Sequence, residues 1–546
     1  MPWKGPFVLL GCATTLLLAP PARARDLKVP GGYPTIQAGI LAARPGDAVV
    51  ISPGIYKERI DFRGKAITVR STKPSDPATV AATIIDGEAG GHVVTFAANE
   101  SRSSVLDGLT IRNGRATDGG GILCSPGSPT IRRCIITGNT ATQNGGGIYC
   151  GAESDPLVDA CRIIGNTARL GGGMCANWEG TASVTDCEFS GNTAQGGGGM
   201  FQGFGYLDVR DSVFSANVAT GATHAGGALC VDSAHGGDVS GCEFRDNRAA
   251  HDGGAVGCLH CEDLEIAGCI FAHNSVDAGS GGALVVRAIS AGDYLRVRNC
   301  LFYGNSADEG GAIACEEGGA SLRNLTIEGN RAHAGGGGGV SFVGGSPVIL
   351  SSIVAYQASG GGIRVDATAE LDVFYCDVFG NSGGNYVGMD DPTGDNGNIS
   401  ANPWFADCLN HDYHECSTVG RYSPLTGTWV VDPVMSPCID AGAPGWSYSL
   451  EPEPNGHRVN MGFYGNTPEA SKSHQVDFVT APTGTPNPCA SGTPVQCNCE
   501  AVCNLGHPVA YRWTATGSDG SFGGTFDDPT KQNPVWTGPA NTTDSP

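Results

Sequence analysis

GGGMCANWEGTASVTDCEFSGN, residues 171–192, and GGAVGCLHCEDLEIAGCIFAHN, residues 253–274, are two copies of one pattern in this chain of 546 residues. Each copy opens on glycines, continues through short runs in which apolar and polar residues alternate, and closes on Phe-x-x-Asn. Alternation with a period of two is typical of a strand with one buried face, and no helical period survives here. The two stretches therefore predict short strands separated by corners of glycine and asparagine.

The opening motif, Gly-Gly-(Gly/Ala)-aliphatic, occurs ten times, and successive copies lie 23 to 29 residues apart. Its aliphatic anchors are Ile122, Ile148, Met174, Met200, Leu229, Val256, Leu284, Ile313, Val340 and Ile363. A repeat of this length indicates one structural unit that is stacked on itself. We predict an all-β fold, a parallel β-helix of about ten coils or more with about three short strands in each coil.

Asparagine recurs at one corner of the predicted coil. The residues are Asn139, Asn166, Asn192, Asn217, Asn247, Asn274, Asn305, Asn330 and Asn381. Asparagine tolerates the left-handed backbone region, and its side-chain amide can bond the amides above and below it. We interpret the set as a structural asparagine ladder. Phenylalanines three residues earlier in five of the repeats are expected to stack inside the coil as an aromatic column.

Many of the 22 cysteines follow the same repeat. One set lies five residues before a ladder asparagine, and a second set lies just after the glycine motif. We favour buried free thiols for both sets, and disulfides, which an exported protein can form, are the alternative. Outside the repeats, Cys489, Cys497, Cys499 and Cys503 are interpreted as two local disulfides rather than as zinc ligands.

The N-terminus has the features of a secretory signal. Lys4, an apolar run over residues 7–19 and an Ala-x-Ala site predict a signal over residues 1–24. We therefore expect a protein that is secreted, extracellular or at the cell surface, including association with an outer membrane. No later segment offers about 18 uninterrupted apolar residues, so no transmembrane segment is expected in the mature chain. A net charge of −22 disfavours a nucleic-acid partner.

The remaining boundaries follow from where the repeat begins and ends. Residues 25–107 are predicted to hold an N-terminal cap, with an amphipathic helix within residues 33–43, and the first coils. Residues 108–400 carry the β-helix repeats, and residues 401–470 are predicted as irregular final coils. Residues 471–546 contain a linker and two candidate strands at 509–514 and 533–537, which resemble part of a PKD-type or immunoglobulin-like module. We expect that module to be incomplete, because its strands are too few for a closed sandwich.

The repeats resemble those of polymorphic outer membrane proteins, whose paired motifs are Gly-Gly-Ala-Ile and Phe-x-x-Asn. Gly310–Ile313 matches the first motif, and Phe189–Asn192 and Phe302–Asn305 match the second. Residues 33–54, YPTIQAGILAARPGDAVVISPG, resemble the opening of secreted β-helix proteins of the pectin-lyase-like superfamily. Both resemblances imply a right-handed parallel β-helix.

Residues that could support catalysis are few. A polysaccharide lyase needs carboxylates that hold calcium beside an Arg or Lys base on one outer face. Arg364 and Asp366 flank Val365, which is expected to face inward, so both should point outward from one strand. Asp390, Asp391 and Asp395 form the one candidate calcium site. We assign no catalytic residue and no cofactor other than this candidate calcium.

The sequence favours an exported, non-catalytic β-helix that displays a long surface for adhesion or carbohydrate binding. We expect a monomer with a glycan or a surface protein as its partner. The alternative is a pectate-lyase-like polysaccharide lyase or hydrolase that acts on acidic glycans. A stacked scaffold can carry many unrelated sites, so the residues on its surface decide between these functions.

Overall fold

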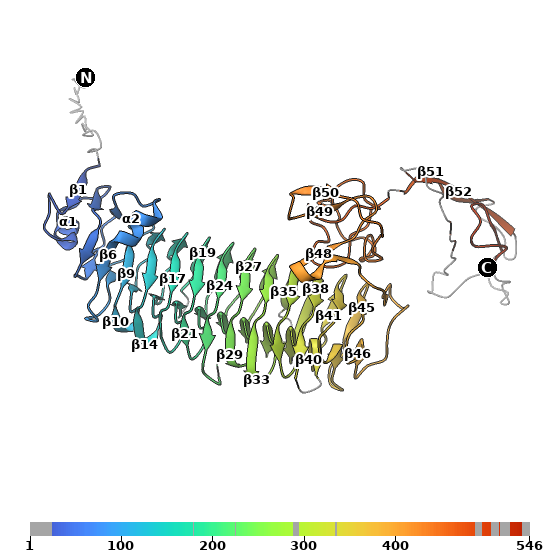
Figure 1. Ribbon diagram of the computed structural model, residues 1–546, viewed down its shortest axis with the longest axis horizontal. Coiled ribbons are helices and arrows are strands. Elements are labelled where there is room, and N and C mark those ends of the chain that lie inside the picture. Colours follow the sequence, from blue (N-terminus) through green and yellow to red (C-terminus); the bar gives the residue numbers. More distant parts are fainter. Residues whose placement is uncertain are drawn as a thin grey trace, which may run out of the picture.

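Short strands wind in successive coils along one axis (Figure 1). The computed structural model describes residues 24–177, 180–223, 225–287, 294–333, 336–474, 476–485, 494–503, 511, 513 and 525–537. The fold is an all-β, right-handed parallel solenoid of about 12 turns in which 3% of the residues are helical, so the predicted fold class is confirmed. The predicted signal over residues 1–24 lies almost wholly outside the described residues.

Three parallel sheets form the walls of the stack, here named sheet 1 (25 strands), sheet 2 (13 strands) and sheet 3 (six strands). One coil contains β18 (Met174–Ala176) in sheet 2, β19 (Ala182–Thr185) and β20 (Glu188–Ser190) in sheet 1, and β21 (Thr193–Ala194) in sheet 3. A coil of this kind has four strands where the alternation predicts about three. The reason is the bend at Asp186, whose left-handed φ of 52° separates β19 from β20 without a glycine to mark it.

Identical side chains stand over one another because neighbouring coils pair in register. Phe189 of β20 lies opposite Phe214 of β24 (Val213–Ser215), and Phe244, Phe271 and Phe302 continue the column. Neighbouring ring centroids lie 4.5–5.0 Å apart with nearly parallel planes. All five rings are fully buried, so the column fills the centre of the stack.

Truncation of one ring should leave a void that the stack cannot close. We expect Phe244→Ala to lower the free energy of unfolding by about 4 kcal/mol, because the cost of a large-to-small core change includes the residual cavity. Denaturant unfolding followed by circular dichroism measures the change. Phe204, which is 43% exposed, is the matched control, and its replacement by alanine should cost less than about 1 kcal/mol. Equal losses in the two variants would contradict the role of the column.

The asparagines at the corner after β20 form a continuous hydrogen-bonded chain. The Asn192 side-chain Nδ2 donates to Asn217 Oδ1 at 3.0 Å and to the carbonyl oxygen of Ile163 at 2.8 Å, and the Asn192 backbone N–H also donates to Asn217 Oδ1. The ladder asparagines do not themselves adopt the left-handed backbone conformation that was expected for them. The preceding residue adopts it, for example Gly191 with φ of 60°, because asparagine must direct its amide along the stack.

The hydrogen-bonded chain includes a residue that is not an asparagine. Gln357 stands between Asn330 and Asn381: its Oε1 accepts from the Asn330 N–H at 2.9 Å, and its own N–H donates to Asn381 Oδ1 at 3.1 Å. Glutamine carries the same amide on a longer side chain, so it can fill the position. A search for asparagine alone misses it.

The cysteines whose side chains the structure describes are free thiols. In the column before the asparagines, the Cys161 thiol donates to the carbonyl oxygen of Ile131 at 3.5 Å, and Cys187 Sγ accepts from the Cys161 N–H at 3.4 Å. Ser212 takes the next place, where its hydroxyl accepts from the Cys187 N–H at 3.1 Å. A hydroxyl in the same role favours the thiol interpretation within the stack.

Helices cover the N-terminal end. The predicted capping helix is present as α1 (Ile36–Ala42), which buries Ile36 and Ile40 and begins with the Thr35 hydroxyl accepting from the Ala38 N–H at 3.1 Å. A second helix, α2 (Pro77–Ala82), starts after Asp76, whose carboxylate accepts from the Thr79 N–H. No helix in the described part of the chain is both long and apolar enough to cross a membrane.

Residues 402–474, here named the C-terminal lobe, lie beside the stack against the outer face of sheet 1 (Figure 1). The lobe contains two short antiparallel pairs, β47 (Phe405–Asp407) with β48 (Asp412–Glu415), and β49 (Arg421–Ser423) with β50 (Thr428–Val430). After it, an antiparallel sheet consists of β51 (Val476–Thr485), β52 (Pro494–Cys503), β53 (Thr525–Phe526) and β54 (Val535–Thr537). The candidate strand at 533–537 contains β54, and most of the one at 509–514 lies outside the described residues.

Candidate functional site

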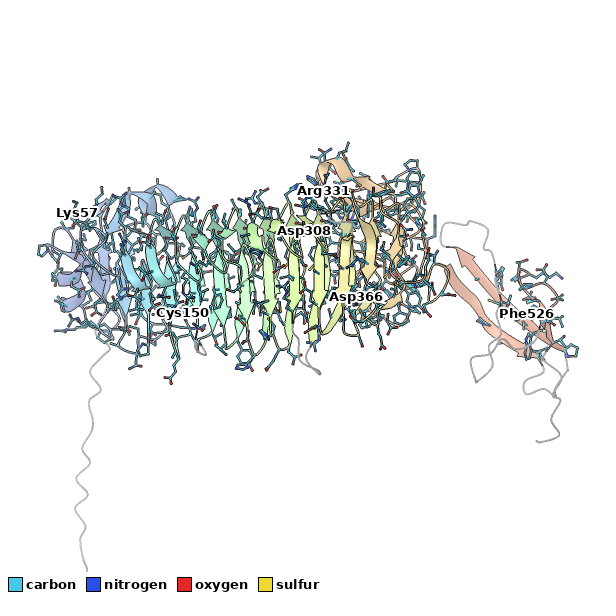
Figure 2. All side chains as sticks on the ribbon, turned by 90° about the horizontal axis from the view of Figure 1, so that it is seen from below. Lys57, Cys150, Asp308, Arg331, Asp366 and Phe526 are labelled. Atoms are coloured by element: carbon cyan, nitrogen blue, oxygen red, sulfur yellow. The ribbon has the colours of Figure 1, made fainter. Side chains whose placement is uncertain are left out.

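The polarity of the outward-facing residues of sheet 2 changes along the stack. Its in-register outward positions are polar in the first coils, as at Thr95, and polar again at the far end, as at Arg364. Between them the same positions are apolar and belong to a second buried cluster that includes Phe201. Two hollows lie at the polar ends. Lys57 lines one and Asp366 lines the other, and both residues are labelled in Figure 2.

The hollow at the far end, here named the charged groove, has a volume of about 330 Å³. It is lined by Ser280, Glu309, Ala314, Glu316, Ser341, Val343, Arg364 and Asp366. These residues belong to β37 (Ile313–Glu316), β40 (Gly337–Val343) and β43 (Gly361–Val365) or lie within a few residues of sheet 2 or sheet 3. Four successive coils therefore supply one surface, which no single repeat could form.

An ion pair spans the groove. Arg364 Nη1 lies 2.7 Å from Glu309 Oε2, and the Ser341 hydroxyl donates to the same oxygen at 3.1 Å. Both charged side chains are only about one-third exposed, which reduces screening by solvent and salt. The pair therefore holds the Arg364 guanidinium in one position.

A second arginine, Arg287, pairs with Glu316, one of the residues that line the groove. Arg287 contacts Glu316 and Asp252, each at 2.6 Å. The hydrogen bond to Glu316, together with Asp252, raises the pKa of Arg287 above its usual range. At the rim, hydrogen bonds from the Thr368 hydroxyl and backbone N–H groups hold the pKa of Asp366 below its usual range, so this carboxylate stays ionised. The arginines and their partners, with Asp366, leave the groove with two more carboxylates than guanidinium groups.

This arrangement is suited to binding rather than to proton abstraction. A guanidinium fixed between carboxylates keeps its proton, whereas a general base must release one near the operating pH. The groove instead offers fixed hydrogen-bond donors on Arg364 and fixed acceptors on Glu309, Glu316 and Asp366, while the buried Ser341 hydroxyl holds Glu309 in place. Hydroxyl groups, which both donate and accept, complement such a surface.

The sequence identifies only part of this groove. Arg364 and Asp366 both line it, and Val365 between them is buried. Glu309 and Ser341 have no local motif, and they meet Arg364 only because the coils pair in register, with Ser341 directly opposite Arg364. In the sequence, the contact between Ser341 and Arg364 is indicated only by their separation, which equals the length of one coil.

The acidic cluster of Asp390, Asp391 and Asp395 lies in an exposed loop after β46 (Tyr386–Val387). Asp391 accepts from the Thr393 N–H at 2.9 Å, as in a solvated turn. Among the described residues, no group of three His, Cys, Asp or Glu side chains is arranged to hold a metal ion. The structure therefore does not bring the three carboxylates together as one site.

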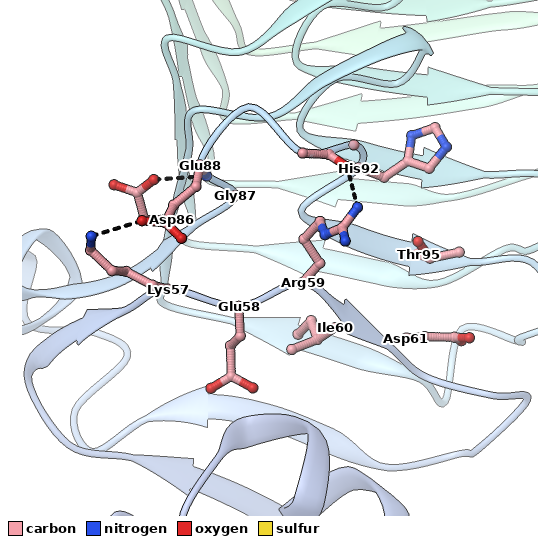
Figure 3. Close-up of a pocket in the computed structure, with 12 residues that line it drawn as sticks. Lys57, Glu58, Arg59, Ile60, Asp61, Asp86, Gly87, Glu88, His92 and Thr95 are labelled. Carbon is pink, nitrogen blue, oxygen red and sulfur yellow. Dashed lines mark hydrogen bonds and ion pairs between the residues drawn. The ribbon is translucent and has the colours of Figure 1, made fainter.

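The hollow at the N-terminal end has a volume of about 550 Å³ and lies between residues 57–61 and residues 86–95 (Figure 3). Its charged groups serve the local structure. Lys57 pairs with Glu88 at 2.7 Å, the Arg59 guanidinium donates to the carbonyl oxygen of Gly90, and Glu58 points away to accept from the Ile36 N–H at the start of α1. These contacts assign the hollow to the N-terminal cap, and the charged groove is the stronger candidate for ligand binding.

Comparisons with known proteins agree with the fold. A family model described as "Right handed beta helix region" matches residues 83–230 and 170–352, and one described as "Disaggregatase related" matches residues 345–442. No curated protein sequence matches the chain.

Two solved structures are similar to the chain in fold. The crystal structure of pectate lyase Pel9A is 12% identical, with 80% of this chain and 96% of that chain covered and a TM-score of 0.32. A mutant of the PL6 family alginate lyase AlyGC is 13% identical, with 78% of this chain and 59% of that chain covered and a TM-score of 0.44. The chain thus spans about three-fifths of the alginate lyase's length.

Proposed function

We propose that the protein is an exported, non-catalytic β-helix whose charged groove binds carbohydrate. One observation carries the proposal: Arg364 and Arg287 are both fixed by carboxylates on a rigid sheet, so the groove presents an ordered set of donors and acceptors without a free base. Groups that are already ordered lose little entropy when a ligand arrives, which favours binding.

The charge of the groove indicates the class of ligand. Carboxylates outnumber guanidinium groups there, and the whole chain has a net charge of −22. A polyanionic glycan would meet like charge, and its carboxylates would find no unpaired arginine in the groove. A neutral polysaccharide, rich in hydroxyl groups, fits better.

The finer assignments belong to the same proposal. Export rests on the signal-like residues 1–24, and a surface role is supported by the Gly-Gly-Ala-Ile and Phe-x-x-Asn motifs of the polymorphic outer membrane proteins. A PKD-type or immunoglobulin-like module after the lobe would add a second binding unit. The protein would act as a monomer with a glycan or a surface protein as its partner.

The alternative function is that of a calcium-dependent polysaccharide lyase. The observation that favours it is the gathering of Glu309, Glu316 and Asp366 around Arg364 in one hollow. Such an enzyme would need calcium to neutralise a uronate and so offset the negative charge of the groove.

Replacement of Arg364 tests the groove. A glycan array with the purified chain identifies a ligand, and calorimetry then compares variants. We expect Arg364→Ala to weaken binding about tenfold or more, because a hydrogen bond to a charged group contributes about 1.5–3 kcal/mol.

Arg162→Ala is the matched control, since it breaks a comparable pair with Glu188 at 2.8 Å on sheet 1, away from the groove. Its affinity should equal that of the unmodified chain. Unsaturated uronate products that appear only with calcium would overturn the non-catalytic proposal and support the lyase.

A further inference from the structure

The C-terminal lobe is attached to sheet 1 by directed hydrogen bonds. Asn299 and Asn324, which occupy the bend of two successive coils, donate their side-chain amides to the carbonyl oxygens of Phe463 and Asn460, each at 3.0 Å. The Phe463 N–H donates in return to the Thr326 hydroxyl at 3.0 Å. The lobe therefore has one defined position on the stack.

The lobe also covers apolar surface. Ile353 and Ala355 point outward from β42 (Ile353–Ala355) and are fully buried against Cys438 and Met461 of the lobe. At the equivalent outward position other coils have polar or partly exposed apolar residues, as at Glu188 and Val213, whereas Ile353 is fully buried beneath the lobe. Removal of the lobe would therefore expose an apolar strip.

Three carboxyl groups are buried within the lobe or where it meets the stack. Glu415 is 0% exposed, and neither of its side-chain oxygens has a hydrogen-bond partner in the part of the chain that the structure describes. Glu451 is 6% exposed; its Oε1 accepts from backbone N–H groups, whereas its Oε2 has no partner among those residues. Asp377, on β45 (Asp377–Phe379), is 0% exposed and accepts from the Cys438 thiol at 3.2 Å. None of the three forms an ion pair with any residue that the structure describes.

The groups around Glu415 supply no compensating positive charge. On its own strand, His414 is bonded to Asp412 at 2.6 Å, and the outer nitrogen of that ring faces Glu469 at 3.6 Å. Asp412 on the same strand and Glu451 from the rest of the lobe repel the Glu415 carboxylate, and the side chains of Tyr464 and Cys438 lie near enough to interact with its charge. Asp440 stands beside Glu451 and adds further negative charge.

Burial of this kind favours the neutral acid over the carboxylate. It raises the pKa of Asp377 to about 6, of Glu451 to about 7 and of Glu415 to about 8. Burial also raises the pKa of Glu328, which faces Tyr413 across the interface, and of Asp440 within the lobe.

We propose that the C-terminal lobe is a pH-sensitive latch, docked on sheet 1 while Glu415 and Glu451 carry their protons and loosened when they ionise. In an unfolded or undocked segment, both acids would have the ordinary pKa of about 4.3. The stabilisation from the neutral acids is therefore complete below about pH 4, declines as the pH rises, and is lost once the pH exceeds the docked pKa of Glu415, about 8. Loosening exposes the apolar strip at Ile353 and Ala355.

Hydrogen exchange on the full chain tests the latch. Amide protection is measured by mass spectrometry near pH 6 and near pH 9, after correction for the intrinsic effect of pH on exchange. We expect protection of residues 402–474 to fall about tenfold or more at the higher pH, while residues 185–275 of the stack change little. Equal protection of the lobe at both pH values in the unmodified chain would overturn the proposal.

Variants assign the effect to the buried acids. Glu415→Gln keeps the size of the side chain but cannot ionise, so the fall in lobe protection between the two pH values should be much smaller. Glu451→Gln should also reduce the fall in lobe protection between the two pH values. It provides an independent test if Glu415→Gln disturbs the structure of the lobe. Glu262→Gln, at an exposed carboxylate, is the control and should behave like the unmodified chain. A full pH response in both buried-site variants would contradict the assignment.

Discussion

Gly172→Ala is expected to abolish cooperative folding of the stack or to lower its free energy of unfolding by more than about 4 kcal/mol. Gly172 begins the approach to β18, and a Cβ at this position would lie 2.5 Å from the carbonyl oxygen of Gly198 and 2.6 Å from that of Thr193. Real Cβ atoms essentially never approach another heavy atom within 3.0 Å. Both oxygens belong to backbone that lies about one turn later in the chain and stacks against Gly172, so relief requires that successive turns separate. Denaturant unfolding and the yield of folded protein measure the loss.

The control lies nineteen residues away in the same coil. Gly191 has a left-handed φ of 60°, but a Cβ there would meet nothing within 4 Å. Ala216 already stands at the equivalent corner of the next coil with φ of 51°. Gly191→Ala should therefore cost only the backbone penalty of about 1–2 kcal/mol. A Gly172 variant as stable as the Gly191 variant would show that the coils can adjust their separation.

Asn217→Ala is expected to lower the free energy of unfolding by about 4 kcal/mol, the second large effect. The Asn217 side chain is fully buried and bonds to Asn192, to Asn247 and to the carbonyl oxygen of Phe189. Alanine would leave these groups buried without partners, and each such group costs about 1–3 kcal/mol. Denaturant unfolding at fixed pH gives the value.

Two further substitutions show whether the amide itself is responsible. Asn217→Gln should retain much of the stability, because Gln357 already fills the same position in a later coil. Asn410→Ala removes an exposed amide that bonds only to Asp407 and should cost less than about 1 kcal/mol. A loss in Asn217→Ala no greater than in Asn410→Ala would mean that the ladder contributes little to stability.

The repeated features of the fold could be predicted from the sequence, because each coil repeats the same physical requirement. The spacing of the glycine motifs predicts the stack, and the capping helix follows from the apolar positions Ile36 and Ile40. The number of strands per coil could not be predicted, because the bend between the two sheet 1 strands falls at residues as different as Asp186, Gly241 and Asn299. Several side chains tolerate that conformation, so no residue type marks it.

The candidate site and the lobe were harder to predict for a different reason. Alternation around Val365 places Arg364 and Asp366 on the outer face, but Glu309 reaches Arg364 across 55 residues, and that contact depends on the exact register of the coils. The bond from Asn299 to Phe463 joins residues 164 positions apart. Such contacts leave no local pattern, although the apolar residues at the outward positions Ile353 and Ala355 are a signal that something covers them.

The in-register pairing of coils has a consequence for how such a molecule can change in length. A duplicated coil would meet the same neighbours as its parent, with phenylalanine over phenylalanine and amide over amide, so no new interface has to arise. Each added coil would carry the charged groove about 4.8 Å farther from the N-terminal helices, leaving its own side-chain geometry intact. The number of coils between cap and groove thus sets the reach of the binding surface, and that reach can be altered in whole steps independently of what is bound.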